Sequence, residues 1–386
     1  MLRPKILIVI SQQPTTDYPN RSNTFVLDFV NDLEVSSSWK NLTDTAKFII
    51  PKNIIFKTKD GNSYDLSGKG KNITAGNNPP FILRGDRISI EAGYWFYDAE
   101  GNEQRPPTTT IFNGFISKVK IKIPIEIECE DNMWLLKQTT APNKVFKGTL
   151  EAMVKELITP LGFDLVDHPQ GITTNVGIFR TQDETIGEVL DRLRKDLRIE
   201  SWFRGNNLHC SSIVYFPNEI ADPQQVFEFQ SNIIDDSLDY SRIDDITLGA
   251  NAISVNKVEL TGTNADGKSK TKSKRLEAFV GKKGGEVRTL YFFDVKTEAE
   301  LKKMGEERLR RFYYEGYRGK FTTFGEPFVK HGDIIKLRDK VLPEREGEYF
   351  VKSVNRKFGV SDGYRQEIEI DIRADVFNKS EIEQGL

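Results

Sequence analysis

The chain has few of the residues on which most metal and catalytic sites depend. Among its 386 residues there are two cysteines and three histidines. Cys129 and Cys210 are far apart in sequence, which excludes a disulfide framework and a thiolate zinc site and fits a reducing compartment. The adjacent pair His209 and Cys210 is too small a ligand set for zinc, which needs three or four protein ligands. We therefore expect no metal and no cofactor.

The sequence also lacks a long hydrophobic run and a strong net charge. The apolar run Ile6–Ile10 is too short for a signal-peptide core or a membrane span, so we expect a first β-strand there and no membrane insertion. A net charge of -2 gives no electrostatic reason to expect nucleic acid as the main ligand. With 38% hydrophobic and 29% charged residues, the composition is that of a soluble globular protein, and the length suggests two or three domains.

What the chain does have is a stretch that occurs twice. FILRGDRISIEAG (residues 81–93) is matched without gaps by FVKHGDIIKLRD (residues 328–339). The shared positions are Phe81, Gly85, Asp86, Ile88 and Ile90 in the first copy and Phe328, Gly332, Asp333, Ile335 and Leu337 in the second. Gly-Asp is typical of a turn, and the alternation after it is typical of a strand. Arg84-Gly85-Asp86 spells an integrin-type tripeptide, but its arginine is not repeated, so a structural turn is the better interpretation.

Similar segments follow both copies. The first is followed by IFNGFISKVKIK and IEIECED, the second by GEYFVKSVNRKF and RQEIEIDIR, with Gly114 and Gly347 in comparable places. Alternation begins at Ile116, and from Val119 to Cys129 the apolar residues share one parity, which predicts an amphipathic antiparallel strand or strand pair with a break at Pro124. We interpret the two stretches as an internal duplication of a small β-barrel-like unit.

The region between the two copies has a different pattern. Apolar residues at spacings of three and four predict a helix over 149–161, ended by Gly162, and a second helix with Asp183 as its N-cap and a stripe from Ile186 to Leu197. Short strands are expected around 178–181 and over 200–211, with a turn at 205–207. This region is predicted to be an α/β insert.

Farther along, strand-like segments over 246–261 are interrupted by a lysine-rich segment, 264–275, and a third helix is expected over about 298–314. Its packing face would use Leu301, Met304, Leu309 and Phe312. The predicted class is α+β and β-rich, with two similar small β-barrel domains flanking the insert. The expected boundaries are 1–139, 140–230 and 231–386, the last domain carrying one helix and a basic loop.

Catalytic patterns are weak throughout. Glu128, Glu130 and Asp131 form an acidic cluster, and paired carboxylates can hydrolyse glycosides. Among 57 acidic residues such clusters arise by chance, so a solvated strand end is the favoured interpretation. We find no nucleophile elbow, phosphate loop or zinc-protease pair, and predict no catalytic residue and no enzymatic activity.

Two surface features remain open at this stage. The basic run Lys268–Arg275 has no interleaved aromatic residues, so we expect a flexible exposed loop; contact with nucleic acid or an acidic partner is the alternative. The aromatic clusters 94–97 and 312–314 are dense enough to suggest subunit contacts as well as core.

The order of these parts resembles the late control protein D family, which comprises the baseplate hubs of contractile phage tails, and the hub portion of type VI secretion spike proteins. The resemblance covers nearly the whole chain. It is carried by GDRISIEAGY, FNGFI, CEDNMWLLK, TIGEVLDRLRKDLRIESWFRGNNLH, GDIIKLRD, GEYFVKSVNRKF and GYRQEIEID.

The resemblance implies a homotrimeric, pseudo-sixfold ring that joins a sixfold tail tube to a threefold spike. The expected partners are the tube protein, other baseplate proteins and a separate spike protein, because no spike-like segment follows the second unit; DNA enters only as a candidate cargo of the lumen. The implied location is the baseplate of a virion, prophage tail or contractile injection system, assembled in the bacterial cytoplasm. Two alternatives stay open: a tail-tip protein of a non-contractile phage with host-surface contact, and a glycan-binding or glycan-hydrolysing β-domain protein.

Overall fold

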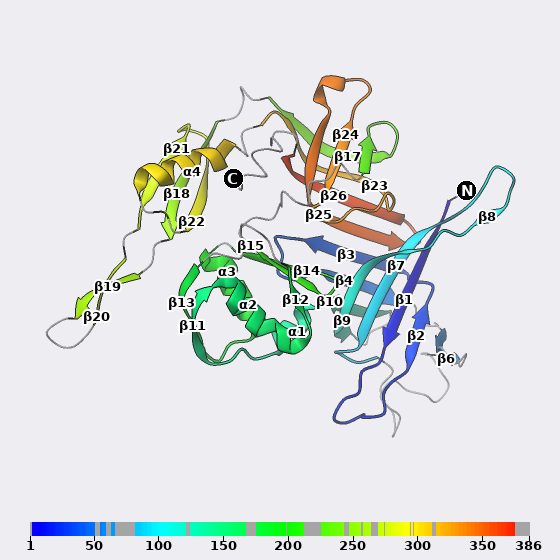
Figure 1. Cartoon of the computed structure of the whole chain (residues 1–386). Helices are drawn as coiled ribbons and strands as arrows, with labels where there is room; N and C mark the ends of the chain where they lie inside the picture. The colour runs from blue at the N-terminus through cyan, green and yellow to red at the C-terminus, as the bar shows by residue number, and fades with distance from the viewer. Residues whose placement is uncertain are drawn as a thin grey trace.

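The computed structural model describes residues 2–50, 55–58, 63–65, 82–120, 124–166, 175–197, 199–211, 225–242, 247–255, 258–263, 269–273, 275–293, 295, 297–310 and 314–374. The predicted signature residue Phe81 and the predicted helix residue Phe312 lie outside these ranges. The described part is rich in strands and has only four α-helices, which confirms the predicted β-rich class (Figure 1).

The first half contributes strands in the order β3-β4-β10-β9-β7-β1-β2-β5-β6, with the short β8 on β7. Their bounds are β1 Leu2–Ser11, β2 Thr24–Leu27, β3 Asp32–Ser38, β4 Thr45–Ile50, β5 Ile55–Thr58, β6 Ser63–Asp65, β7 Arg87–Tyr97, β8 Glu103–Gln104, β9 Thr109–Lys120 and β10 Ile125–Glu130. The predicted first strand is β1, and the predicted strand pair after Ile116 is β9 with β10, which pair antiparallel.

The second half contributes the order β17-β23-β26-β25, with β24 between β25 and β16. The bounds are β16 Gln225–Glu228, β17 Ile233–Ser241, β23 Gly316–Phe324, β24 Ile334–Arg338, β25 Gly347–Gly359 and β26 Gly363–Arg373, with a 3₁₀ turn at Pro343–Arg345. In β26 every second residue from Tyr364 to Ile372 is buried, as expected for a strand with one face on the core.

The two halves are joined edge to edge. Strand β25 pairs antiparallel with β3 over seven residue pairs, from Ser353 opposite Ser38 to Gly359 opposite Asp32. This pairing fuses the halves into one 16-stranded sheet. In the described residues no strand pairing closes either half, so two separate barrels stay a prediction. Phe358 and Tyr364 of the second half are part of the hydrophobic core of the first.

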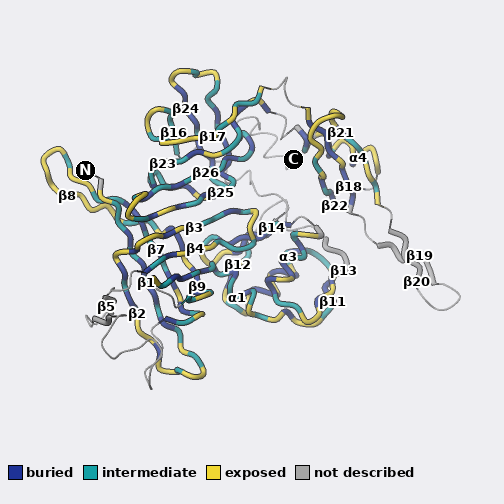
Figure 2. The backbone as a smooth tube through the Cα atoms, turned by 180° about the vertical axis from the view of Figure 1, so that it is seen from behind, coloured by how far each residue is buried: buried dark blue, intermediate teal, exposed yellow. Residues whose placement is uncertain are grey.

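The insert has its own core, which extends from Met133 to Cys210 (Figure 2). Its elements are α1 Met133–Gln138, β11 Lys144–Thr149, α2 Leu150–Ile158, a 3₁₀ turn at Thr159–Leu161, β12 Asp164–Leu165, β13 Asn175–Thr181, α3 Ile186–Leu197, β14 Glu200–Arg204 and β15 Asn207–Ser211. The predicted helices are α2 and α3, and Gly162 ends the first in a left-handed conformation.

One local prediction about the insert is wrong, and one of its helices has no signal in the sequence. Asp183 does not cap α3; its backbone φ is +51°, and Thr185 caps instead, because its hydroxyl accepts the Glu188 N–H while the Glu188 carboxylate accepts the Thr185 N–H. Helix α1 was not predicted, since six residues are too few to show a helical period.

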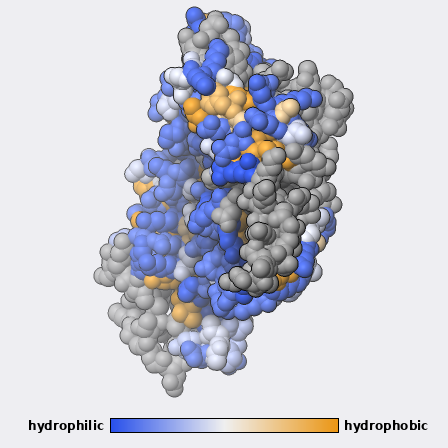
Figure 3. All heavy atoms as spheres, turned by 90° about the vertical axis from the view of Figure 1, so that its left-hand side faces the viewer, coloured by the Kyte–Doolittle hydropathy of each residue, from blue (hydrophilic) through white to orange (hydrophobic). Residues whose placement is uncertain are grey.

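The predicted third domain contains a separate core that extends from Leu248 to Leu309. It is built by β18 Leu248–Val255, β21 Glu277–Gly281, β22 Glu286–Phe293 and α4 Glu298–Arg310. Leu301 and Leu309 are buried and Met304 is half-buried, as the pattern predicts. Figure 3 views the side of the molecule where this module lies; that side is mostly hydrophilic, with an apolar patch in its upper part.

The lysine-rich segment is not simply a loop. Residues Ser269–Ser273 form β20, which pairs antiparallel with β19, Val258–Thr263. The prediction of a loop over all of 264–275 is therefore wrong for these five residues, because alternating Ser, Lys and Thr carries no strong strand signal. Lys268 and Lys274 lie outside the described residues.

Candidate functional site

The two Gly-Asp turns have the same backbone hydrogen bonds. In the first, the Gly85 N–H donates to the Ile116 carbonyl at 2.8 Å, and the Ile116 N–H donates to the Asp86 carbonyl at 2.9 Å. In the second, the Gly332 N–H donates to the Val351 carbonyl at 2.7 Å, and the Val351 N–H donates to the Asp333 carbonyl at 2.9 Å. Each turn is therefore hydrogen-bonded to the strand that pairs with the one directly after the turn, which is β9 beside β7 in the first half and β25 beside β24 in the second.

The aspartates close the two turns in the same way. The Asp86 carboxylate accepts the Leu83 N–H at 2.8 Å, and the Asp333 carboxylate accepts the Lys330 N–H at 2.7 Å. The glycine φ angles are +93° and +86°, a region that L side chains rarely adopt, which explains why glycine precedes each aspartate.

The strand residues of the signature lie as the alternation predicts. Ile88, Ile90, Ile335 and Leu337 are all buried. The suggested match of Gly114 with Gly347 is wrong by two residues: Ile88 pairs with Gly114 but Ile335 pairs with Tyr349, and Gly347 pairs with Leu337. The two glycines lie on corresponding strands, β9 and β25, without being equivalent.

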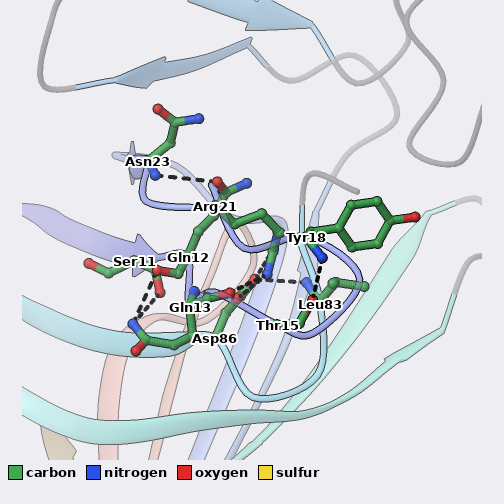
Figure 4. A network of polar contacts seen from close by, with 9 residues as sticks. All are labelled: Ser11, Gln12, Gln13, Thr15, Tyr18, Arg21, Asn23, Leu83 and Asp86. Atoms are coloured by element: carbon green, nitrogen blue, oxygen red, sulfur yellow. Dashed lines mark hydrogen bonds and ion pairs between the residues drawn. The ribbon is translucent and has the colours of Figure 1, made fainter. Parts of the chain in front are cut away.

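Asp86 is anchored by a buried arginine (Figure 4). Arg21 donates to both carboxylate oxygens of Asp86, at 2.8 and 2.7 Å, and the two side chains are 0% and 1% exposed. Arg21 also donates to the Gln13 carbonyl at 2.9 Å, and the Gln13 N–H donates to Asp86 Oδ1 at 2.9 Å. The bidentate pair thus ties the loop after β1 to the turn.

Asp333 has a different anchor, which comes from the insert. Arg204 at the end of β14 donates to the His331 carbonyl at 2.8 Å and lies 3.9 Å from Asp333 Oδ1. Arg204 is partly exposed, so this contact is weaker than the Arg21–Asp86 pair. Burial raises the pKa of Asp333, and the Lys330 N–H and Arg204 oppose that rise.

The insert touches both turns. A Cβ placed on Gly85 would lie 3.3 Å from the Trp134 ring of α1, and one on Gly332 would lie 2.7 Å from the Arg204 guanidinium. Trp134 stacks on Phe115 of β9 with ring centroids 5.1 Å apart. The repeated turns are therefore among the places where the insert packs against the two halves of the sheet.

Several titratable groups are buried where the halves and the insert meet. Burial raises the pKa of Asp44 to about 6, and it raises the pKa of Asp131 well above its usual value, with the nearby Asp44 carboxylate adding to the effect. Burial, followed by the positive charges of Arg204 and Arg356, lowers the pKa of His331 to about 3. His331 Nε2 lies 3.9 Å from Asp44 Oδ2.

The acidic cluster does not form a paired-carboxylate site. Glu130 pairs with Lys137 at 2.7 Å, and Glu128 pairs with Lys120. The expectation of a solvated strand end is wrong for Asp131, which is 7% exposed and accepts the Met133 N–H at the start of α1. Among the described residues no group of three or more His, Cys, Asp or Glu side chains could hold a metal ion.

The remaining predicted features are divided between core and surface. Phe328 is half-buried against the core of the first half, with the Arg356 guanidinium 4.4 Å from its ring centroid. In the first aromatic cluster Tyr94 packs on Tyr364, whereas Phe96 and Tyr97 are 39% and 49% exposed. Tyr314 of the second cluster is buried.

Sequence reasoning missed the anchors Arg21 and Arg204. Arg21 is 65 residues before Asp86, and no local spacing links them. Trp134 could have been noticed as a large aromatic residue beside the acidic strand end, but nothing in its neighbourhood pointed to Gly85.

The fold was compared with those of known proteins. It is similar to the tail protein from Neisseria meningitidis MC58, with a TM-score of 0.58 and 12% identity over 97% of each chain. It is also similar to the 43 kDa tail protein of prophage MuSo2 from Shewanella oneidensis, with a TM-score of 0.55 and 13% identity over 95% of this chain and 98% of that chain. No protein-family model matches the sequence, and neither does any curated protein.

In the described residues no helix is long and apolar enough to cross a bilayer. The chain shares the fold of these two tail proteins over almost its whole length, and the predicted resemblance to tail proteins is confirmed at the level of the fold.

Proposed function

We propose that this chain is the structural hub of a phage or phage-like tail baseplate and adapts a sixfold tail tube to a threefold spike. The fold that it shares with two tail proteins supports a role in a tail. The hub assignment goes further and rests on the internal organisation of the chain.

The observation that carries the proposal is the side-by-side placement of two similar units in one sheet. The two Gly-Asp turns make the same hydrogen bonds, each is followed by a strand pair, and β25 joins β3 to make the sheet continuous. We infer that the halves are copies of one ancestral unit. Three chains would then present six similar units, and a closed ring of heterologous contacts is the assembly that such a subunit forms.

The proposed partners follow from that symmetry. The six similar units would face the tail tube, and the threefold arrangement would seat a separate spike protein and other baseplate proteins. Such a role needs no reaction, because all of the work is done by shape and by contacts between subunits. The site of action would be the baseplate of a virion or an injection system, assembled in the bacterial cytoplasm.

Light scattering of the purified chain tests the proposal, with negative-stain images of the same sample. We expect the mass of three chains and ring-shaped particles, and we expect no signal on a glycan array or in a glycan-hydrolysis screen. A chain that stays monomeric at high concentration, and forms no ring with tube and spike proteins, would contradict the proposal.

A further inference from the structure

The junction between the halves shows how two of these units join. Along one side of β25, residues Gly347–Phe350 pair with β24, Val351 binds the Gly-Asp turn, and residues Ser353–Gly359 pair with β3. The last part of β25 thus provides the edge with which β3 of the first half pairs.

Strand β9 has the same order of partners as β25, except that its last described residues have no strand partner on this side. Residues Thr109–Phe115 pair with β7 and Ile116 binds the first Gly-Asp turn. The following residues pair with β10 on the other side. In the described residues no strand pairs with the free side of Lys118–Lys120.

Strand β17 is the equivalent of β3. In the first half Val35 of β3 is opposite Ala46 of β4, which is opposite Cys129 of β10. In the second half Leu238 of β17 is opposite Gly319 of β23, which is opposite Ile370 of β26. Strand β3 has β25 on its outer side, whereas β17 has no strand partner there in the described residues.

We propose that the free side of β9 in one copy pairs antiparallel with β17 of the next copy, in the register that β25 and β3 use within the chain. Asn355 is opposite Ser36 at the internal junction. Counting from the turn-bound residues Ile116 and Val351, Lys120 takes the place of Asn355. Counting from the equivalent residues Leu238 and Val35, Asp239 takes the place of Ser36. The interface therefore sets Lys120 of one copy opposite Asp239 of its neighbour. This inference rests on the proposed ring and specifies its contact.

The charges of the two edges support this pairing. In the β9 edge Lys118 is exposed, and Lys120 is half-exposed and already pairs with Glu126 and Glu128 of β10. On β17, Asp235, Asp236 and Asp239 are all exposed. No ion pair to these three carboxylates occurs within the part of the chain that the structure describes. Opposite charges on facing edges favour the contact, whereas pairing of β17 with a second β17 would set acidic residues against one another.

A cysteine pair tests the register in the full-length chain. We expect that Lys120→Cys with Asp239→Cys, after mild oxidation, gives disulfide-linked chains up to a closed set of three on a non-reducing gel. The two native cysteines are buried and contribute no background. Lys120→Cys with Asp362→Cys is the matched control, because Asp362 is exposed in the turn between β25 and β26, away from the proposed edge.

A charge reversal provides a second readout. Asp235→Lys with Asp239→Lys should abolish the assembly that the wild-type chain forms, with unchanged circular dichroism, whereas Asp362→Lys should leave it intact. If rings form but the Lys120–Asp239 pair does not cross-link and the reversal has no effect, this interface is wrong and the proposed function stands. If the wild-type chain forms no ring and no cross-link appears, both are overturned.

Discussion

The two Gly-Asp turns are alike in their backbone and different in their anchors. The first is held by Arg21, a buried arginine from the same half of the sheet, through two short bonds to Asp86. The second is held by Arg204 from the insert, which reaches the His331 carbonyl and only approaches Asp333. The backbone hydrogen bonds are the same in both turns, whereas each side-chain anchor depends on which element packs beside the turn.

The residue before the glycine shows the same difference. Arg84 in the first turn is exposed and donates to Gln138 at 3.1 Å, whereas His331 in the second is buried beside Trp202. Arg84 therefore meets the insert at the surface, whereas His331 meets it in a buried contact.

Replacement of each aspartate by alanine should give the largest difference in stability between the two turns. Asp86→Ala leaves Arg21 buried without its partner, and we expect a loss of about 3–5 kcal/mol in the free energy of unfolding. Asp333→Ala removes the hydrogen bond from the Lys330 N–H and the more distant contact with Arg204. It should lower the free energy of unfolding by about 1–2 kcal/mol. Urea unfolding of both variants checks this; equal losses would show that the Arg21 pair is not the stronger anchor.

Acid should destabilise the folded chain through His331 of the second turn. Because the pKa of His331 is about 3 in the folded chain against 6.5 when unfolded, its contribution to stability is present above pH 6.5 and is lost as the pH falls toward 3. The raised pKa of Asp44 acts the other way: its contribution is present below 3.8 and lost as the pH rises through about 6.

The variant His331→Gln removes the histidine contribution alone. Between pH 6.5 and 4.5 its unfolding free energy should fall less steeply than that of the wild type, by at most about 1.4 kcal/mol per pH unit. Arg84→Gln, at the matching position of the first turn, should give a curve parallel to the wild type. Parallel curves for both variants would rule out the buried histidine as the acid-sensitive group.

Replacement of the two glycines should give the smallest difference in stability between the turns. Gly85→Ala and Gly332→Ala both force a side chain into positive φ, at a cost of about 1–2 kcal/mol each. The Gly85 methyl group would lie 3.3 Å from the Trp134 ring, whereas the Gly332 methyl would lie 2.7 Å from the Arg204 guanidinium and would push it away from the His331 carbonyl. We therefore expect the second variant to have the slightly lower melting temperature; the reverse order would show that the Trp134 contact is the less tolerant of the two.

Local features of the fold could be predicted from the sequence. Helices α2 and α3 and strands β9 and β10 follow from periodicity, and the Gly-Asp turns follow from residues that are adjacent in the chain. The anchors could not be predicted, because Arg21 and Asp86 are brought together only by the pairing of β1 with β7. The same holds for the junction of β25 with β3, which joins residues more than three hundred positions apart.

The wrong predictions at the candidate site also arise from contacts between residues that are distant in the chain. The sequence indicates that Asp131 is acidic and at a strand end, but its burial depends on the Asp44 loop and α1, which lie against it. The sequence around His331 indicates no partner for its ring, because its environment is made by Trp202 of β14 and Asp44 of the β3–β4 loop, which are distant in the chain.

The rotational symmetry of the purified assembly tests the central claim most directly. Averaged electron images viewed down the ring axis should show threefold symmetry with a strong sixfold component, because the two halves of each chain would occupy similar positions around the ring. Particles with only twofold symmetry, open filaments, or rings without the sixfold component would contradict the claim that the duplicated turns mark equivalent units.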